Sequence, residues 1–128
     1  MLIIHIIRSN VMKTDLTYLR NMSAGNKELV IEMIDIFKEQ VAEFCTGMDN
    51  YMKSNEYESL GRLAHKAKSS ISIMGLNELA DELKKFETLA KAGKEVDKYP
   101  IFIKKFKDET YEAMQELEEV AKNIDIYF

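Results

Sequence analysis

The sequence predicts an all-α fold, an antiparallel up-and-down four-helix bundle with a short extra N-terminal helix. Apolar residues recur at intervals of three and four along most of the chain, as they do on one face of a helix. Helix-forming residues dominate these stretches, and the chain contains a single proline, Pro100. With 128 residues, 46% of them hydrophobic and 31% charged, the chain is long enough for one folded domain and too short to expect two.

The first eleven residues precede the helical pattern. They include an apolar run, Met1 to Ile7, which is much shorter than the roughly 20 residues that a membrane span needs. The run also lacks a charged leader and a small-residue cleavage site, so we expect no signal peptide. We interpret residues 1–11 as an appendage, in which His5 has no assigned role, and residues 12–128 as the bundle domain.

The first two helices are marked by capping residues. Thr14 and Asp15 can cap a short helix that begins near Leu16 and ends at residues 23–25, Ser-Ala-Gly. Asn26 can then cap a long helix whose apolar stripe continues to Met52. Gly47 lies within this helix and predicts a local bend or break, because glycine weakens a helix by up to about 1 kcal/mol relative to alanine.

Glycines and the proline separate the remaining three helices. The third runs from about residue 56 to 74 and stops at Gly75. The fourth begins at Asn77 and ends at Gly93, which suits the left-handed conformation after a helix end. Pro100 fits the first turn of the fifth, since its missing N–H would be unpaired there, and the last apolar stripe continues to Ile124.

Charge and cysteine content exclude several classes of function. The formal net charge is −4 and the arginines are scattered, so we expect no nucleic-acid partner and no membrane partner. The single cysteine, Cys45, cannot form an internal disulfide, and its apolar helical neighbours predict that it fills the core. A chain of this kind suits a reducing compartment, and we expect a cytoplasmic location.

His65 falls nearly opposite the apolar stripe of the third helix. Its face is shared by Gly61, Ser69 and Ser72, which are small, and by Lys68, one turn away. The small residues would leave the imidazole approachable by another molecule. No other metal-ligand residue lies one turn away, and the chain contains neither a nucleophile elbow nor a phosphate-binding glycine loop.

A self-contained enzyme or a metal site is therefore not expected. A neutral imidazole is a competent nucleophile near neutral pH, so His65 could react with an electrophile brought by a partner. An exposed histidine without a function is the alternative that periodicity alone leaves open.

The third and fourth helices also resemble a known family, the histidine-containing phosphotransfer (HPt) domains of multistep phosphorelays. The residues that carry the resemblance are the stretch from Ala64 to Ser70, then Gly75-Leu76, Leu79, Leu83 and Glu87. It extends over roughly residues 13–124. Three residues depart from the usual pattern: Ala67 replaces leucine, Ser69 replaces glycine, and Phe86 replaces leucine.

The resemblance implies that His65 accepts a phosphoryl group on Nε2 from a receiver-domain aspartate and passes it to another receiver domain. Lys68 would stabilise the phosphoryl group, and Gly61, Ser69, Ser72, Ile73 and Leu76 would form the partner-binding surface. Response-regulator receiver domains are then the expected partners, with a hybrid histidine kinase as a further one. Magnesium is expected on the receiver domain, whereas this chain would bind no metal or cofactor and would act as a monomer.

Two other functions stay open. A noncatalytic helical adaptor would bind receiver domains without becoming phosphorylated. A helical scaffold would associate through the apolar residues Leu2 to Ile7, and light scattering after deletion of residues 1–11 would test it.

Overall fold

The computed structural model describes residues 12–128. The expected appendage, residues 1–11, lies outside this range, and so do His5 and the apolar run of the scaffold hypothesis. Over the described range the secondary structure consists of helices and contains no strand, so the predicted all-α class is confirmed.

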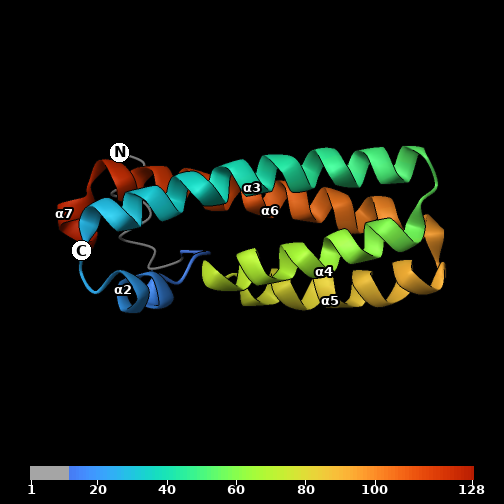
Figure 1. Cartoon of the computed structure of the whole chain (residues 1–128), viewed down its shortest axis with the longest axis horizontal. Coiled ribbons are helices and arrows are strands. Elements are labelled where there is room, and N and C mark those ends of the chain that lie inside the picture. Colours follow the sequence, from blue (N-terminus) through green and yellow to red (C-terminus); the bar gives the residue numbers. More distant parts are fainter. Residues whose placement is uncertain (1–11) are drawn as a thin grey trace.

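Four long helices form the body of the molecule: α3 (Lys27–Lys53), α4 (Tyr57–Ile73), α5 (Asn77–Ala92) and α6 (Tyr99–Lys122). Figure 1 shows them lying along the long axis of the molecule, each joined to the next at alternate ends. The most extensive contact is between α4 and α5. The shorter elements are α2 (Thr17–Ser23), the 3-10 turn η1 (Val96–Lys98) and α7 (Ile124–Tyr127).

Most helix ends follow the local signals in the sequence. The side chain of Asn26 accepts a hydrogen bond from the backbone N–H of Leu29 (3.1 Å), as expected of a cap. Gly93 has φ +65° at the end of α5, and Pro100 lies in the first turn of α6. The break considered at Gly47 does not occur, since α3 is continuous through this residue. The side chain of Leu63 of α4 packs in the space that a Cβ of residue 47 would occupy.

The core is formed by the predicted apolar stripes, together with a tyrosine that periodicity did not single out. Tyr99 is completely buried at the start of α6. Its hydroxyl lies 2.8 Å from the carbonyl oxygen of Leu89 and 2.7 Å from that of Lys94, and so joins α6 to the end of α5. Nearby, the rings of Phe86 and Phe102 stack with centroids 5.1 Å apart and an interplanar angle of 7°.

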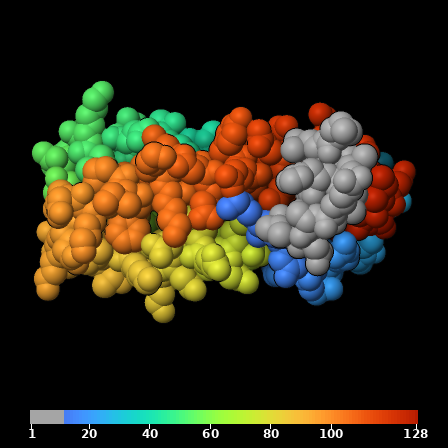
Figure 2. Space-filling view, turned by 180° about the vertical axis from the view of Figure 1, so that it is seen from behind, coloured from blue at the N-terminus to red at the C-terminus, as the bar shows by residue number. Residues whose placement is uncertain are grey.

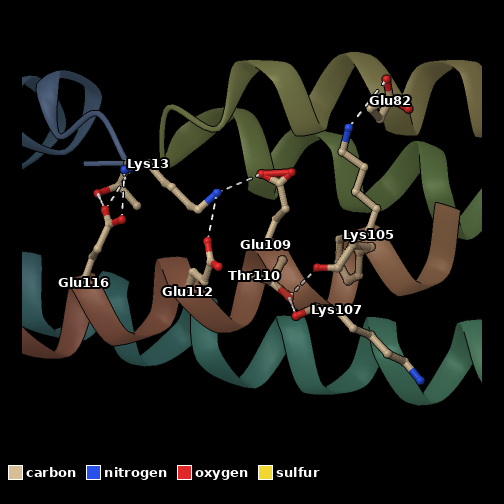
Figure 3. A network of polar contacts seen from close by, with 10 residues as sticks. Lys13, Glu82, Lys105, Lys107, Glu109, Thr110, Glu112 and Glu116 are labelled. Atoms are coloured by element: carbon tan, nitrogen blue, oxygen red, sulfur yellow. Dashed lines mark hydrogen bonds and ion pairs between the residues drawn. The ribbon is translucent and has the colours of Figure 1, made fainter. Parts of the chain in front are cut away.

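Residues 12–16, here called the N-terminal strap, connect α6 to the turn between α4 and α5. The buried carboxylate of Glu116 accepts hydrogen bonds from the backbone N–H groups of Lys13 (2.9 Å) and Thr14 (3.1 Å) and from the Thr14 hydroxyl (3.0 Å) (Figure 3). The backbone N–H of Asp15 donates to the carbonyl of Met74 (3.0 Å). The strap thus joins segments that are far apart in sequence.

The N-cap residue of the short α2 is Leu16, whose side chain makes no capping hydrogen bond, rather than Thr14 or Asp15 as expected. Asp15 accepts hydrogen bonds from the backbone N–H (3.0 Å) and hydroxyl (2.6 Å) of Thr17, which lies in the first turn of α2. Thr14 is instead committed to Glu116 and does not cap the helix.

Between Met12 and Phe128, none of the helices combines the length and the apolar character that crossing a membrane requires.

Candidate functional site

His65 projects from the middle of α4, and the exposure expected from periodicity is confirmed. Leu60, Ala64, Ala67 and Ile71 form the buried stripe of this helix, whereas 60% of the His65 side chain is exposed. The imidazole is therefore open to another molecule.

Glu87 of α5 contacts the imidazole from the neighbouring helix. Its two carboxylate oxygens lie 3.1 and 3.0 Å from Nδ1 of His65. Since a carboxylate only accepts hydrogen bonds, the contact favours the neutral tautomer with the proton on Nδ1. The lone pair of the ring is then on Nε2, the atom expected to react.

Two lysines approach the same carboxylate. Lys91 Nζ lies 2.8 Å and Lys68 Nζ 3.7 Å from a carboxylate oxygen of Glu87, whose side chain is 14% exposed. Burial raises the pKa of Glu87, but the hydrogen bonds from Lys91 and His65 outweigh it, so the pKa is lowered overall. Glu87 is therefore an anion at neutral pH. Any stability that this ionisation adds is present at neutral pH and is lost as the pH falls through the lowered pKa.

The cluster was only partly accessible to sequence reasoning. Lys68 follows His65 by one turn, so its proximity was expected from spacing alone. Glu87 entered only through the family resemblance, and Lys91 was not singled out. Both come from α5, and no periodicity within α4 could predict that Glu87 contacts His65 while Lys91 contacts Glu87.

Gly61 occupies a different place from the one expected. It was predicted on the open face beside His65, but it is buried where α4 packs against α5. A Cβ at this position would lie 2.7 Å from Lys91 Cγ, 2.9 Å from Lys91 N and 3.1 Å from the carbonyl oxygen of Glu87. Gly61 therefore lets α5 bring the Glu87 carboxylate up to the imidazole.

We expect Gly61→Ala to lower the free energy of unfolding by about 1–3 kcal/mol, because the new methyl group meets the backbone of α5. Gly47→Ala is the matched control. Its Cβ would meet only the Leu63 side chain, which can move, and alanine favours the helix by up to about 1 kcal/mol. Urea unfolding of both variants measures the difference. Equal losses of stability would contradict the role assigned to the α4–α5 contact.

The other expected contact residues divide into exposed and buried positions. Ser69 and Ser72 are exposed and Ile73 is partly exposed, as a contact surface requires. The prediction that Leu76 offers exposed apolar atoms is wrong, since Leu76 is 5% exposed and belongs to the core. Leu76 follows the turn at Gly75, where α4 has ended, so helical periodicity no longer predicts which way its side chain points.

An apolar groove on the α3 side adds residues of α3 that the sequence did not indicate as part of the site. It is formed by Ile36, Phe37, Met33 and Gln40 of α3 and by Ser70, Ile73 and Met74 of the α4 end. Ile36 is 53% exposed, and the Ser70 hydroxyl donates to Gln40 Oε1 (2.9 Å). Ile73 joins this groove to the His65 surface, which therefore has a polar edge toward α5 and an apolar edge toward α3.

Within residues 12–128, no three His, Cys, Asp or Glu side chains gather in a way that could hold a metal ion. Cys45 is partly buried in α3, and burial raises the pKa of its thiol.

The fold and the site together define a class: an all-helical module that presents one accessible imidazole, oriented by a carboxylate, to another molecule. The family model described as "Hpt domain" matches residues 32–119, from α3 into α6, a range that includes His65, Lys68 and Glu87. This chain belongs to the Hpt domain family, and its class of function is histidine phosphotransfer in two-component signalling. Hpt domains interact with response-regulator receiver domains and histidine kinases. Searches of curated proteins and of solved structures find no match.

Proposed function

We propose that this protein is a phosphorelay intermediate, in which His65 accepts a phosphoryl group from a receiver-domain aspartate and passes it to another receiver domain. The observation that supports this most directly is the pairing of Nδ1 with Glu87, which leaves Nε2 accessible as a nucleophile. The partner would supply its own magnesium ion, and this chain would supply the nucleophile and the contact surface.

In the proposed step the Nε2 lone pair attacks phosphorus, the bond from phosphorus to the aspartyl oxygen breaks, and the aspartate leaves as a carboxylate. The proton on Nδ1 stays on the ring. Positive charge develops on the imidazole as the N–P bond forms, and the Glu87 carboxylate, 3.0 Å from Nδ1, stabilises it. Attack by a second receiver aspartate on the phosphohistidine reverses these bond changes.

The proposed docking surface consists of Ser69, Ser72 and Ile73 on α4, extended by Ile36 on α3. Side chains as small as serine let a partner's active site come close to the ring. Gly61 and Leu76 are buried and do not belong to this surface. We further propose that the protein is cytoplasmic and acts as a monomer. Light scattering measures its oligomeric state directly.

The test is incubation with a phosphorylated receiver domain, followed by a search for an adduct that is labile in acid and stable in base. The wild-type protein should acquire this label on His65. If it stays unlabelled with every receiver domain of its organism, the proposal fails.

We expect Lys68→Ala to slow phosphoryl transfer about tenfold or more, because it removes the ammonium group that lies one helical turn from His65 and would pair with the transferred phosphoryl group. Lys66→Ala is the control, since Lys66 is exposed on α4 and contacts no carboxylate among the described residues. Rapid-quench measurement of the transfer rate separates them, and circular dichroism should show both folded. Equal rates for the two variants would remove Lys68 from the reaction.

The alternative function is a noncatalytic adaptor that binds receiver domains on the same surface. The groove that contains the exposed Ile36 and the partly exposed Ile73 would serve it equally well. An adaptor binds the receiver and never becomes labelled, so the labelling experiment distinguishes the two functions.

A further inference from the structure

A second surface lies between α5 and the start of α6, away from His65. It is a groove of about 740 Å³ lined by Asp81, Lys84, Lys85, Thr88, Leu89, Lys98 and Phe102. Figure 2 shows α5 and α6 side by side on the face seen from behind. Nothing in the proposed phosphotransfer uses these residues.

The rim of this groove is positive in a protein that is negative overall. Three lysines line it against one aspartate, whereas the whole chain has a formal charge of −4. Lys84 is exposed and pairs with no carboxylate in the part of the chain that the structure describes. Lys85 is 69% exposed and lies 3.5 Å from Glu82, and Lys98 is 54% exposed and pairs with Glu95. Exposed pairs of this kind contribute little and exchange easily for another anion.

The floor of the groove is apolar and held in place. Phe102 is stacked on the buried Phe86, and Leu89 is partly buried beside it. Ile101, the residue before Phe102, is 69% exposed on the first turn of α6. A fixed aromatic floor with a cationic rim suits a partner that combines apolar and negatively charged groups.

We propose that the α5–α6 groove binds an acidic segment of a partner protein that carries at least one large apolar side chain. The apolar side chain packs on Phe102 and Leu89, and the carboxylates pair with Lys84, Lys85 and Lys98. Charge complementarity is the argument for this occupant.

The groove can be filled while a receiver domain is docked at His65. Glu87 contacts α4, whereas Lys85 and Leu89 share the groove with residues of η1 and α6. The two surfaces thus lie on different sides of α5. The proposal does not depend on phosphotransfer, and failure of one leaves the other standing.

The probe is a short fluorescent peptide rich in glutamate with one central phenylalanine, titrated with the full chain at low and high salt. Fluorescence anisotropy should show saturable binding that weakens as salt increases. The double variant Lys84→Glu, Lys98→Glu should bind at least about tenfold more weakly. Lys53→Glu, Lys122→Glu is the charge-matched control, since both lysines are exposed at the ends of α3 and α6.

Amide chemical shifts measured by NMR locate the bound peptide. Shifts concentrated at residues 81–102 support the proposal, and shifts centred on His65 overturn it. Equal weakening in the two double variants, or no binding by the wild type, also overturns it. Binding to phosphatidylserine vesicles is measured in parallel. Binding to the vesicles without binding to the peptide would overturn the proposal and assign the groove to a lipid surface.

Discussion

Replacing His65 with glutamine is expected to abolish acceptance of phosphate from a receiver domain completely. Glutamine keeps a polar side chain on the exposed face of α4 but has no ring nitrogen with a free lone pair. The loss of phosphate acceptance should exceed that caused by any other single substitution, because the N–P bond that carries the phosphoryl group can no longer form. Radiolabel transfer from a phosphorylated receiver measures it.

The same variant should fold normally and still bind the receiver. His65 is 60% exposed and contributes nothing to the buried stripe of α4, so the thermal transition should stay within a few degrees of the wild type. Retained binding with lost labelling identifies a phosphotransfer protein. A wild-type protein that binds equally and is never labelled would instead identify the adaptor.

Replacing Gly75 with alanine is expected to cause the largest loss of stability among the glycine substitutions, about 2–4 kcal/mol. Gly75 has φ +74°, where a Cβ costs about 1–2 kcal/mol. A Cβ would also lie 2.3 Å from Asp15 Cβ, 2.6 Å from Asp15 N and 2.7 Å from Asp15 O. The N-terminal strap would have to move away and give up the hydrogen bond from Asp15 to Met74.

Gly93→Ala separates the backbone cost of a positive φ from the cost of the clash with the N-terminal strap. Gly93 has φ +65°, but a Cβ there would meet nothing within 4 Å, so only the backbone cost of about 1–2 kcal/mol applies. Urea unfolding followed by circular dichroism compares the variants. If both lose the same free energy, the strap does not depend on the space left by Gly75.

Local signals in the sequence predicted what depends on neighbours along the chain. The Asn26 cap, the left-handed Gly93 and the first-turn Pro100 each follow from a few adjacent residues. The exposure of His65 follows from the helical period of α4 alone. These features need no knowledge of how the helices pack.

Features that depend on packing between helices were missed or misplaced. Gly61 is within 40° of His65 on the helical period, yet α5 passes so close that this side of α4 is covered. Leu76 is turned inward after Gly75. The contact of Glu87 with His65 requires α4 and α5 to lie at one particular separation, which a sequence pattern does not contain.

The single carboxylate of Glu87 determines the net charge that a phosphoryl group on His65 would meet. Glu87 faces two ammonium groups, Lys68 and Lys91, so the cluster has a formal charge of +1 while the imidazole is neutral. A phosphoryl group brings a charge of roughly −2 near neutral pH and would exceed that surplus. If His65 is the carrier, the surplus positive charge of the cluster would offset about half of the charge of its phosphoryl group.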